Sequence, residues 1–121
     1  MIIFWTGKAI SENQRIAPGR GRYIVNQEYA AFKESVAWTC KKWADGQSFD
    51  GPVCVRLLMA LNPRMDAQNV IKPVLDALEL AGVIRNDRQV RQFGFYRTDR
   101  AKGEDDRIDI FVRGADNEQE L

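Results

Sequence analysis

The stretch Pro52-Val-Cys-Val-Arg-Leu-Leu-Met-Ala-Leu61 is a nearly unbroken apolar run of strand length. Half-exposed strands usually alternate apolar with polar residues, whereas such a run is typical of a strand covered on most of both faces. We therefore expect residues 52 to 61 to form a central strand of a sheet.

The segment after this strand has the period of a helix. Its apolar residues recur at three and four positions, namely Ile71, Val74, Leu75 and Leu78. This spacing predicts a helix from about Asn69 to Ala81-Gly82, where glycine ends the pattern. Pro73 costs little if the helix begins near Asn69, but would bend a helix that begins at Asp66.

The N-terminal half predicts a strand, a loop and a second helix. Residues 2 to 6 are β-branched or aromatic and favour a strand, while residues 7 to 22 are polar and glycine-containing and should bury little. Asn26 is placed to cap a helix over residues 27 to 44 that ends at Gly46. Its expected buried face carries Tyr29, Phe32, Val36, Cys40 and Trp43.

The C-terminal part predicts two more strands, over residues 88 to 97 and 107 to 113, joined as a hairpin through a charged connection. Residues 114 to 121 form an acidic segment that we expect to be disordered. The element order is thus β-loop-α-β-α-β-β. It favours a single compact α+β domain, residues 1 to 113, with two main helices packed on a mixed sheet.

Composition excludes several chemistries. The 121 residues include 18 basic and 17 acidic residues and no histidine, with a formal charge of +1, so histidine-based catalysis is ruled out. Cys40 and Cys54 lack C-x-x-C spacing, which argues against zinc and favours buried thiols in a reducing, cytoplasmic compartment. The first residues are too short for a signal segment, and no apolar run reaches membrane-spanning length.

Carboxylates flank the second predicted helix. Asp66 precedes it and Asp87 follows it, and carboxylate oxygens are the ligands that Mg²⁺ prefers. At one hundred degrees per residue, Asn69, Lys72 and Asp76 project within about sixty degrees of one another, away from the apolar stripe. Asp87 reaches the same region only if the next strand runs back alongside the helix.

Each of these residues also has an ordinary structural interpretation. Asp66 suits a helix cap, Lys72 and Asp76 suit an i,i+4 ion pair, and Asn86-Asp87 suits a turn. Taken singly, those interpretations are favoured. The combination and its order in the chain favour a functional site.

In this combination the sequence resembles the RusA-type Holliday junction resolvases, small metal-dependent endodeoxyribonucleases of bacteria and their prophages. The family motif runs approximately D-x-D-N-x-x-K, D-A-L and G-x-x-x-D-D-x-x-V. The corresponding segments here are Asp66-Ala-Gln68-Asn69-Val-Ile-Lys72, Asp76-Ala-Leu78 and Gly82-Val-Ile-Arg-Asn86-Asp87-Arg-Gln-Val90. The resemblance extends over roughly residues 3 to 113, through Ser11-Glu-Asn13-Gln-Arg15, Gly19-Arg-Gly-Arg22 and Gln27-Glu-Tyr29.

The resemblance implies that Asp66 and Asp87 are the essential acids and that Lys72 is the catalytic lysine. It implies Mg²⁺, with Mn²⁺ as a substitute, at a site to which Asp76 is a further candidate ligand. Two family acids are replaced by amides, Gln68 and Asn86, which carry no charge. Gln68 stays a candidate catalytic and metal-binding residue through its oxygen.

The resemblance further implies four-way DNA junctions as substrate and a homodimer that presents two active sites. Candidate DNA-binding residues are Asn13, Arg15, Arg20, Arg22, Arg64 and Asn69. Arginine suits bidentate phosphate contacts, which supply affinity without reading bases.

Three hypotheses therefore stand after the sequence alone. The first is a Mg²⁺-dependent junction-resolving endonuclease. The second is a junction-binding protein whose cleavage has been lost through Gln68 and Asn86. The third is an oligomerisation or protein-interaction module, in which the aromatic residues matter and the clustered acids do not.

Overall fold

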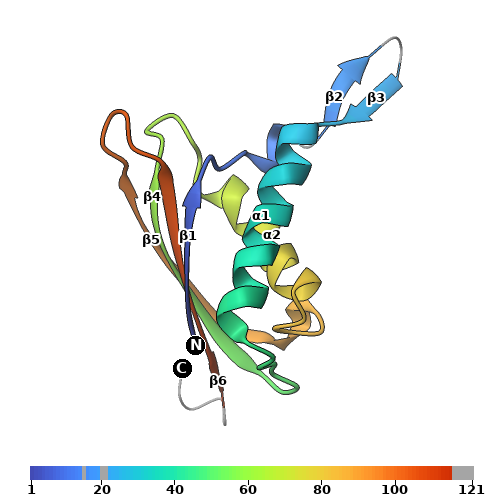
Figure 1. Cartoon of the computed structure of the whole chain (residues 1–121), viewed down its shortest axis with the longest axis vertical. Helices are drawn as coiled ribbons and strands as arrows, with labels where there is room; N and C mark the ends of the chain where they lie inside the picture. Colours follow the sequence, from blue (N-terminus) through green and yellow to red (C-terminus); the bar gives the residue numbers. More distant parts are fainter. Residues whose placement is uncertain (15, 20–21, 116–121) are drawn as a thin grey trace.

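Strand β4 (Val53–Leu61) lies in the interior of a four-stranded sheet of order β1-β6-β4-β5. It runs parallel to β5 (Val90–Asp99) and antiparallel to β6 (Asp106–Gly114), which pairs in turn with the edge strand β1 (Ile2–Gly7). This computed structural model describes residues 1–14, 16–19 and 22–115, with the backbone alone for 16–19 and 22–25 (Figure 1). The predicted central strand, mixed sheet and α+β class are confirmed.

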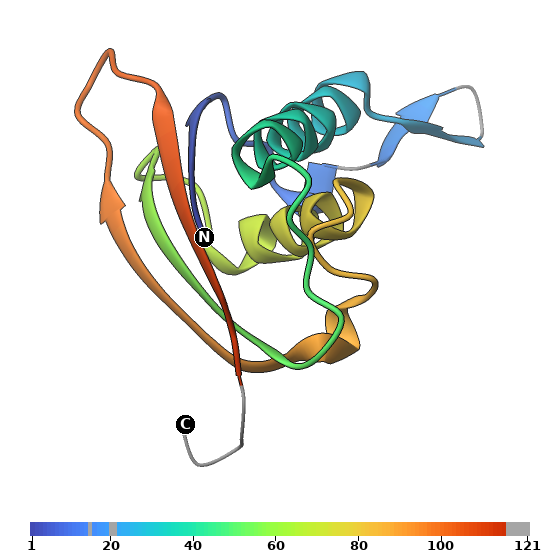
Figure 2. The same cartoon turned by 60° about the horizontal axis from the view of Figure 1, so that its bottom comes forward.

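Helices α1 (Gln27–Ala44) and α2 (Gln68–Leu80) both cover the same face of the sheet (Figures 1 and 2). Between them and the sheet lies the core, into which Val55, Leu57 and Ile110 point with no exposed surface. The opposite face carries no helix. Leu58, the neighbour of Leu57, is 44% exposed there, so the expectation that β4 is covered on most of both faces is wrong.

Helix α1 begins and ends as predicted. The Asn26 side chain accepts hydrogen bonds from the backbone N–H groups of Glu28 and Tyr29, and Asp45 ends the helix in the left-handed region at φ 48°. The predicted buried face is confirmed except for Trp43, which is 48% exposed. The indole of Trp43 lies beside the edge strand and packs edge-to-face with the ring of Phe4, at a centroid distance of 5.3 Å. In the last turn of α1, Ala44 is the residue that is buried.

Helix α2 begins at Gln68, so Pro73 lies inside it and has no N–H to donate to the Asn69 carbonyl. The buried face consists of Val70, Pro73, Val74, Ala77 and Leu78. The helix ends at Gly82, whose φ of 76° suits glycine, with Val83 N–H donating to the Leu78 carbonyl at 3.0 Å.

Residues 7 to 22 differ from the predicted loop. Ala9 and Ile10 are buried, a 3-10 turn η1 forms over Glu12–Gln14, and the chain then makes a two-stranded hairpin. Its strands are β2 (Ile16–Gly19) and β3 (Arg22–Val25), and Figure 1 shows the hairpin projecting away from the sheet before α1 begins. Within the described residues, β2 and β3 pair with each other and not with the four-stranded sheet. Their sequence therefore lacks the alternation of apolar and polar residues from which a strand is predicted.

The predicted hairpin between the last two strands is wrong, because β4 lies between β5 and β6 and pairs with both. The connection over residues 100 to 105 crosses the end of β4. The first residues of the predicted 88–97 strand instead form a 3-10 turn, η2 (Asp87–Gln89). The predicted disordered tail, residues 114 to 121, begins too early, because Gly114 belongs to β6 and Ala115 is buried, with its N–H donating to the Pro52 carbonyl at 2.8 Å. Residues 116 to 121 lie outside the described residues.

Both cysteines are buried, as predicted, and burial raises the pKa of the Cys40 thiol to about 12. Within the described ranges, no helix is both long and apolar enough to cross a membrane.

Candidate active site

The turn from Asn62 to Asp66 joins the end of β4 to the start of α2. Asp66 is exposed, and its Oδ1 accepts a hydrogen bond from the backbone N–H of Gln68 at 3.0 Å. The N-cap residue of α2 is Ala67, without a side-chain capping bond, so Asp66 forms a turn one residue before the cap and is not the predicted cap itself. Since the bond to Gln68 uses one carboxylate oxygen, it leaves the group available for further ligation.

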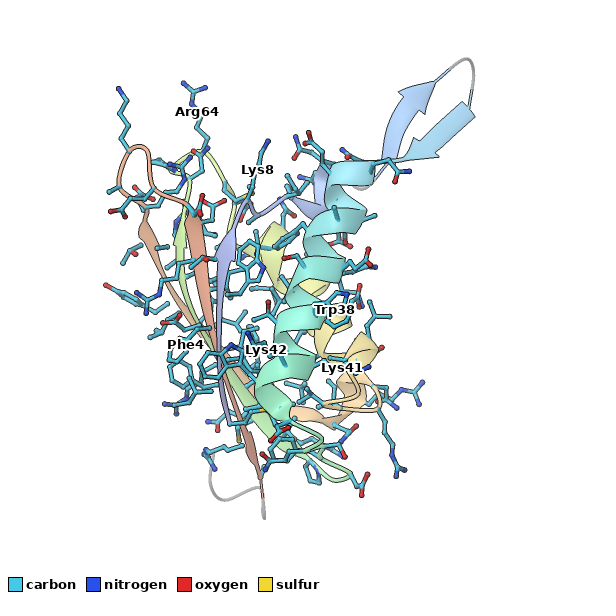
Figure 3. The ribbon with its side chains drawn as sticks, viewed as in Figure 1. Phe4, Lys8, Trp38, Lys41, Lys42 and Arg64 are labelled. Carbon is cyan, nitrogen blue, oxygen red and sulfur yellow. The ribbon has the colours of Figure 1, made fainter. Side chains whose placement is uncertain are left out.

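A cleft of about 670 Å³ opens beside this turn. Four residues predicted for the site line it together: Asn13, Arg64, Asp66 and Asn69. Lys8 and Arg100 line it as well, and Figure 3 shows Lys8 and Arg64 projecting at the same end of the molecule. The lining is of mixed charge, because acidic residues share it with these bases, namely Glu28, Asp66, Glu104, Asp105 and Asp106. Lys8 is paired with Glu28 and Arg100 with Asp106, so Arg64 is the base best placed to meet a phosphate.

A second group of charged residues lies further along α2. Lys72 Nζ is 3.0 Å from Asp76 Oδ1 and 3.7 Å from Asp87 Oδ2. Lys33 of α1 lies 3.9 Å from the other oxygen of Asp76. The hydrogen bond and charge of Asp76, with the charges of Asp87 and Glu79, raise the pKa of Lys72, so the ammonium form is favoured.

The sequence places Asp87 near Lys72 only if the chain runs back alongside the helix, and the structure meets this condition. The chain turns at Gly82, and Asn86 then caps η2 by accepting the N–H of Arg88 at 2.9 Å. The N–H of Asp87 donates to Glu79 Oε1 at 2.7 Å, which fixes this segment against the end of the helix. The turn interpretation of Asn86-Asp87 and its contact with the helix are thus both observed.

Asp66 lines the cleft, whereas Lys72, Asp76 and Asp87 are not among the residues that line it. Along the chain, Lys72 lies six residues after Asp66. Across the residues that the structure describes, no group of three or more Asp, Glu, Cys or His is arranged to hold a metal ion. Gln68 is exposed next to Asp66.

The predicted arginine loop is only partly described. Arg15 and Arg20 lie outside the described residues, and Arg22 is described only as a backbone position of β3. Their DNA-binding role stays a prediction. Asn13, on η1, is exposed at the cleft.

Sequence reasoning missed several residues of the cleft. Lys8 and Arg100 line it, and the buried Asp106 and the half-buried Arg97 contact the turn that bears Asp66. Asp106 ends the acidic run Glu104-Asp105-Asp106, whose composition indicates an exposed loop. Only the pairing of β6 with β4 distinguishes the buried member of that run from its neighbours.

A small α+β domain with an exposed carboxylate in a cleft of mixed charge is compatible with a nuclease but does not identify one. The comparison with known families agrees: the family described as Endodeoxyribonuclease RusA matches residues 7–113. The chain therefore belongs to the RusA endodeoxyribonuclease family. Membership implies an endonuclease that resolves Holliday junctions. No curated protein matches the chain.

Proposed function

We propose that the protein is a divalent-metal-dependent endonuclease that resolves four-way DNA junctions by paired symmetric nicks in recombination and repair. One observation carries the proposal: the exposed carboxylate of Asp66 shares a cleft with Lys8 and Arg64. Carboxylates and basic side chains that share one cleft are suited to holding a cation beside a bound phosphate. Family membership supplies the DNA backbone as the source of that phosphate.

In this proposal Asp66 and Asp87 hold the cation, with the amide oxygen of Gln68 and the carboxylate of Asp76 as further donors. Of these four, only Asp66 lines the cleft, so metal binding would have to draw Asp87 toward Asp66. All four are hard oxygen ligands, which fit Mg²⁺ and Mn²⁺. When bound, the metal would activate water and neutralise charge on the phosphate. Asn86 is a weak candidate ligand, because its side-chain oxygen already caps η2.

Lys72 acts in this proposal as a fixed positive charge. Its raised pKa keeps it protonated, so it stabilises negative charge on the phosphate and does not accept a proton. The 3.7 Å ion pair with Asp87 gives it a second role, which is to hold Asp87 against α2. Cation binding by Asp87 would compete with that ion pair.

DNA would be gripped mainly through its phosphates. Lys8 and Arg64 supply charge at the cleft, while Asn13 and Asn69 supply neutral hydrogen-bonding groups there. Arg15, Arg20 and Arg22 are further candidate phosphate contacts, as the resemblance implies. Contacts of this kind position a backbone without reading its bases.

Symmetric nicks in a four-way junction require two active sites, so we propose a homodimer. The helix-free face of the sheet offers a surface for the second copy. Its exposed apolar residues are Ile2 (47%), Phe4 (43%), Leu58 (44%) and Tyr96 (66%). Asp109 of β6 lies in register between Phe4 and Leu58, so the face combines apolar residues with a charged pair, Arg107 and Asp109. Exposed aromatic and aliphatic residues of this kind are found at protein interfaces.

A second candidate function is junction binding without cleavage. It is favoured by Gln68 and by Asn86, because neither amide carries the charge that strengthens metal binding. The DNA-binding residues of the cleft are unaffected by those two replacements.

Cleavage of a labelled four-way junction, with Mg²⁺ or Mn²⁺, tests the proposal. Paired symmetric nicks in the junction, lost in Asp87→Asn and absent on linear duplex of the same sequence, are the expected result. Junction binding without nicks under either metal would support the second function. If the protein neither binds nor cuts the junction, the interaction-module hypothesis takes their place.

A further inference from the structure

The turn that bears Asp66 is held by residues from the far end of the chain. The buried carboxylate of Asp106, 4% exposed, accepts a hydrogen bond from the backbone N–H of Asn62 at 2.9 Å. Arg100 Nε donates to that same carboxylate oxygen at 3.0 Å, and the other oxygen accepts the N–H of Ala9 at 2.9 Å. One side chain therefore ties together three segments that line the cleft.

Arg97 holds the same turn from β5. Its Nη2 donates to the Asn62 carbonyl at 2.9 Å and its Nη1 to the Met65 carbonyl at 2.6 Å. Met65 directly precedes Asp66, so the guanidinium fixes the peptide group through which Asp66 is attached. Nε of Arg97 is buried and has no hydrogen-bond partner among the described residues, a cost that the two carbonyl bonds must offset.

The sheet order explains why these contacts form. Because β4 lies between β5 and β6, the connection from one to the other passes the end of β4, where the turn begins. Arg100 N–H donates to the Leu61 carbonyl at 2.8 Å on that passage. Side chains of β5 and β6, which are distant in sequence from the turn, thus hold one short turn that buries little apolar area of its own.

Resting on the proposed nuclease function, we infer that Asp106 and Arg97 are positioning residues for Asp66. They touch neither DNA nor metal in this inference. They set the place and direction of the Asp66 carboxylate by hydrogen bonding the backbone on its N-terminal side. Residues that orient a metal ligand in this way typically change metal affinity or activity by about 10- to 100-fold when replaced.

The test replaces Asp106 by Asn, which preserves the shape of the side chain. Both carboxylate oxygens of Asp106 accept hydrogen bonds, so the NH₂ group of asparagine would face a donor at whichever position it takes. Asp109→Asn is the matched control. Asp109 lies on the same strand, is 6% exposed and binds Arg107 through two hydrogen bonds of 3.0 and 2.8 Å, yet it makes no contact with the turn. Arg97→Lys is the second variant, since a lysine cannot reproduce the two-carbonyl contact.

Two readouts are measured for each variant at a concentration where light scattering shows the wild-type oligomeric state. The first is amide hydrogen exchange over residues 62 to 66. The second is the single-turnover cleavage rate at saturating junction and its dependence on Mn²⁺, together with the junction Kd. For Asp106→Asn and Arg97→Lys we expect faster exchange in the turn, cleavage lowered about 10- to 100-fold and an unchanged Kd.

Asp109→Asn should match the wild type in exchange over the turn. Its cleavage is left out of the comparison, because Asp109 lies beside Leu58 and Tyr96 on the proposed dimer face. Unchanged exchange in the turn of both Asp106→Asn and Arg97→Lys would overturn the inference, as would equally fast exchange in Asp109→Asn. If the wild-type protein neither binds nor cuts the junction, the proposed function fails. The exchange data still decide whether Asp106 and Arg97 position the turn. If Asp106→Asn does not fold, Arg97→Lys decides alone.

Discussion

The ammonium group of Lys72 lies 3.7 Å from Oδ2 of Asp87, so one ion pair joins α2 to the segment that follows it. Asp76 approaches the same ammonium at 3.0 Å. Lys72 is therefore surrounded by negative charge, and the pKa of its side chain is raised, first by the hydrogen bond to Asp76. A lysine in this state is suited to electrostatic stabilisation and unsuited to accept a proton near neutral pH.

The first prediction concerns pH. A lysine whose folded-state pKa lies above its ordinary value keeps its charge, and its contribution to stability, at every pH below that ordinary value of about 10.4. Between pH 7 and 9 we therefore expect no decline of cleavage from loss of the Lys72 proton. Lys72→Arg should retain the flat profile, whereas Lys72→Gln should lower cleavage about 100-fold or more at every pH.

Single-turnover rates from pH 6 to 9.5 measure this, with the junction Kd of each variant as the control for DNA binding. A decline between pH 7 and 9 that disappears in Lys72→Arg would contradict the assignment.

The second prediction concerns the missing charge beside Asp66. Gln68 is exposed and adjacent to the cleft, so Gln68→Asp adds a carboxylate without disturbing the core. One added charged ligand contributing roughly 1.4 kcal/mol would tighten Mn²⁺ binding about tenfold. Isothermal titration with Mn²⁺ measures the affinity, and cleavage at limiting Mn²⁺ should rise with it.

Gln68→Glu is the control for distance, because it adds the same charge on a longer side chain. If Gln68→Asp weakens both metal binding and cleavage, the glutamine itself is a working part of the site.

The sequence was informative where structure is local. The helix predicted from the period of residues 71 to 78, the Asn26 cap and the strand over residues 52 to 61 each depend on neighbouring residues, and each of these elements is confirmed. Strand pairing is not local: the strands predicted over residues 88 to 97 and 107 to 113 were expected to pair with each other, but β5 and β6 both pair with β4. A short charged connection can join two strands that pair directly as a hairpin, or two strands that lie on either side of a third strand, and the sequence does not distinguish the two.

The same limit explains what was missed at the site. Asp66, Lys72 and Asp87 were identifiable because they lie at fixed positions around one helix. Asp106 reaches Asn62 only through the pairing of β6, so no spacing in the sequence indicates their contact. Trp43 was misplaced for a related reason, since the end of α1 meets the edge of the sheet at Phe4.

The third prediction concerns stability. Asn26 Oδ1 accepts two backbone N–H groups at the start of α1, at 2.8 and 3.3 Å. Asn26→Ala should lower the free energy of unfolding by about 1 kcal/mol, because those donors lose their partner. Asn26→Ser, which keeps an acceptor oxygen, should recover most of the loss. Urea unfolding followed by circular dichroism measures both, and equal stability of the alanine variant and the wild type would show that the cap contributes nothing.

The fourth prediction concerns the proposed dimer. Leu58 is 44% exposed on the helix-free face of the sheet, so Leu58→Asp places a charge in the proposed interface, where burial without a partner is costly. Light scattering should then report a monomer. Trp38→Asp is the matched control, since Trp38 is 68% exposed on α1, away from that face (Figure 3). The Leu58 variant should nick junctions one strand at a time and lose paired cleavage, because symmetric nicks need two linked sites. A Leu58→Asp protein that stays dimeric would exclude this face as the interface.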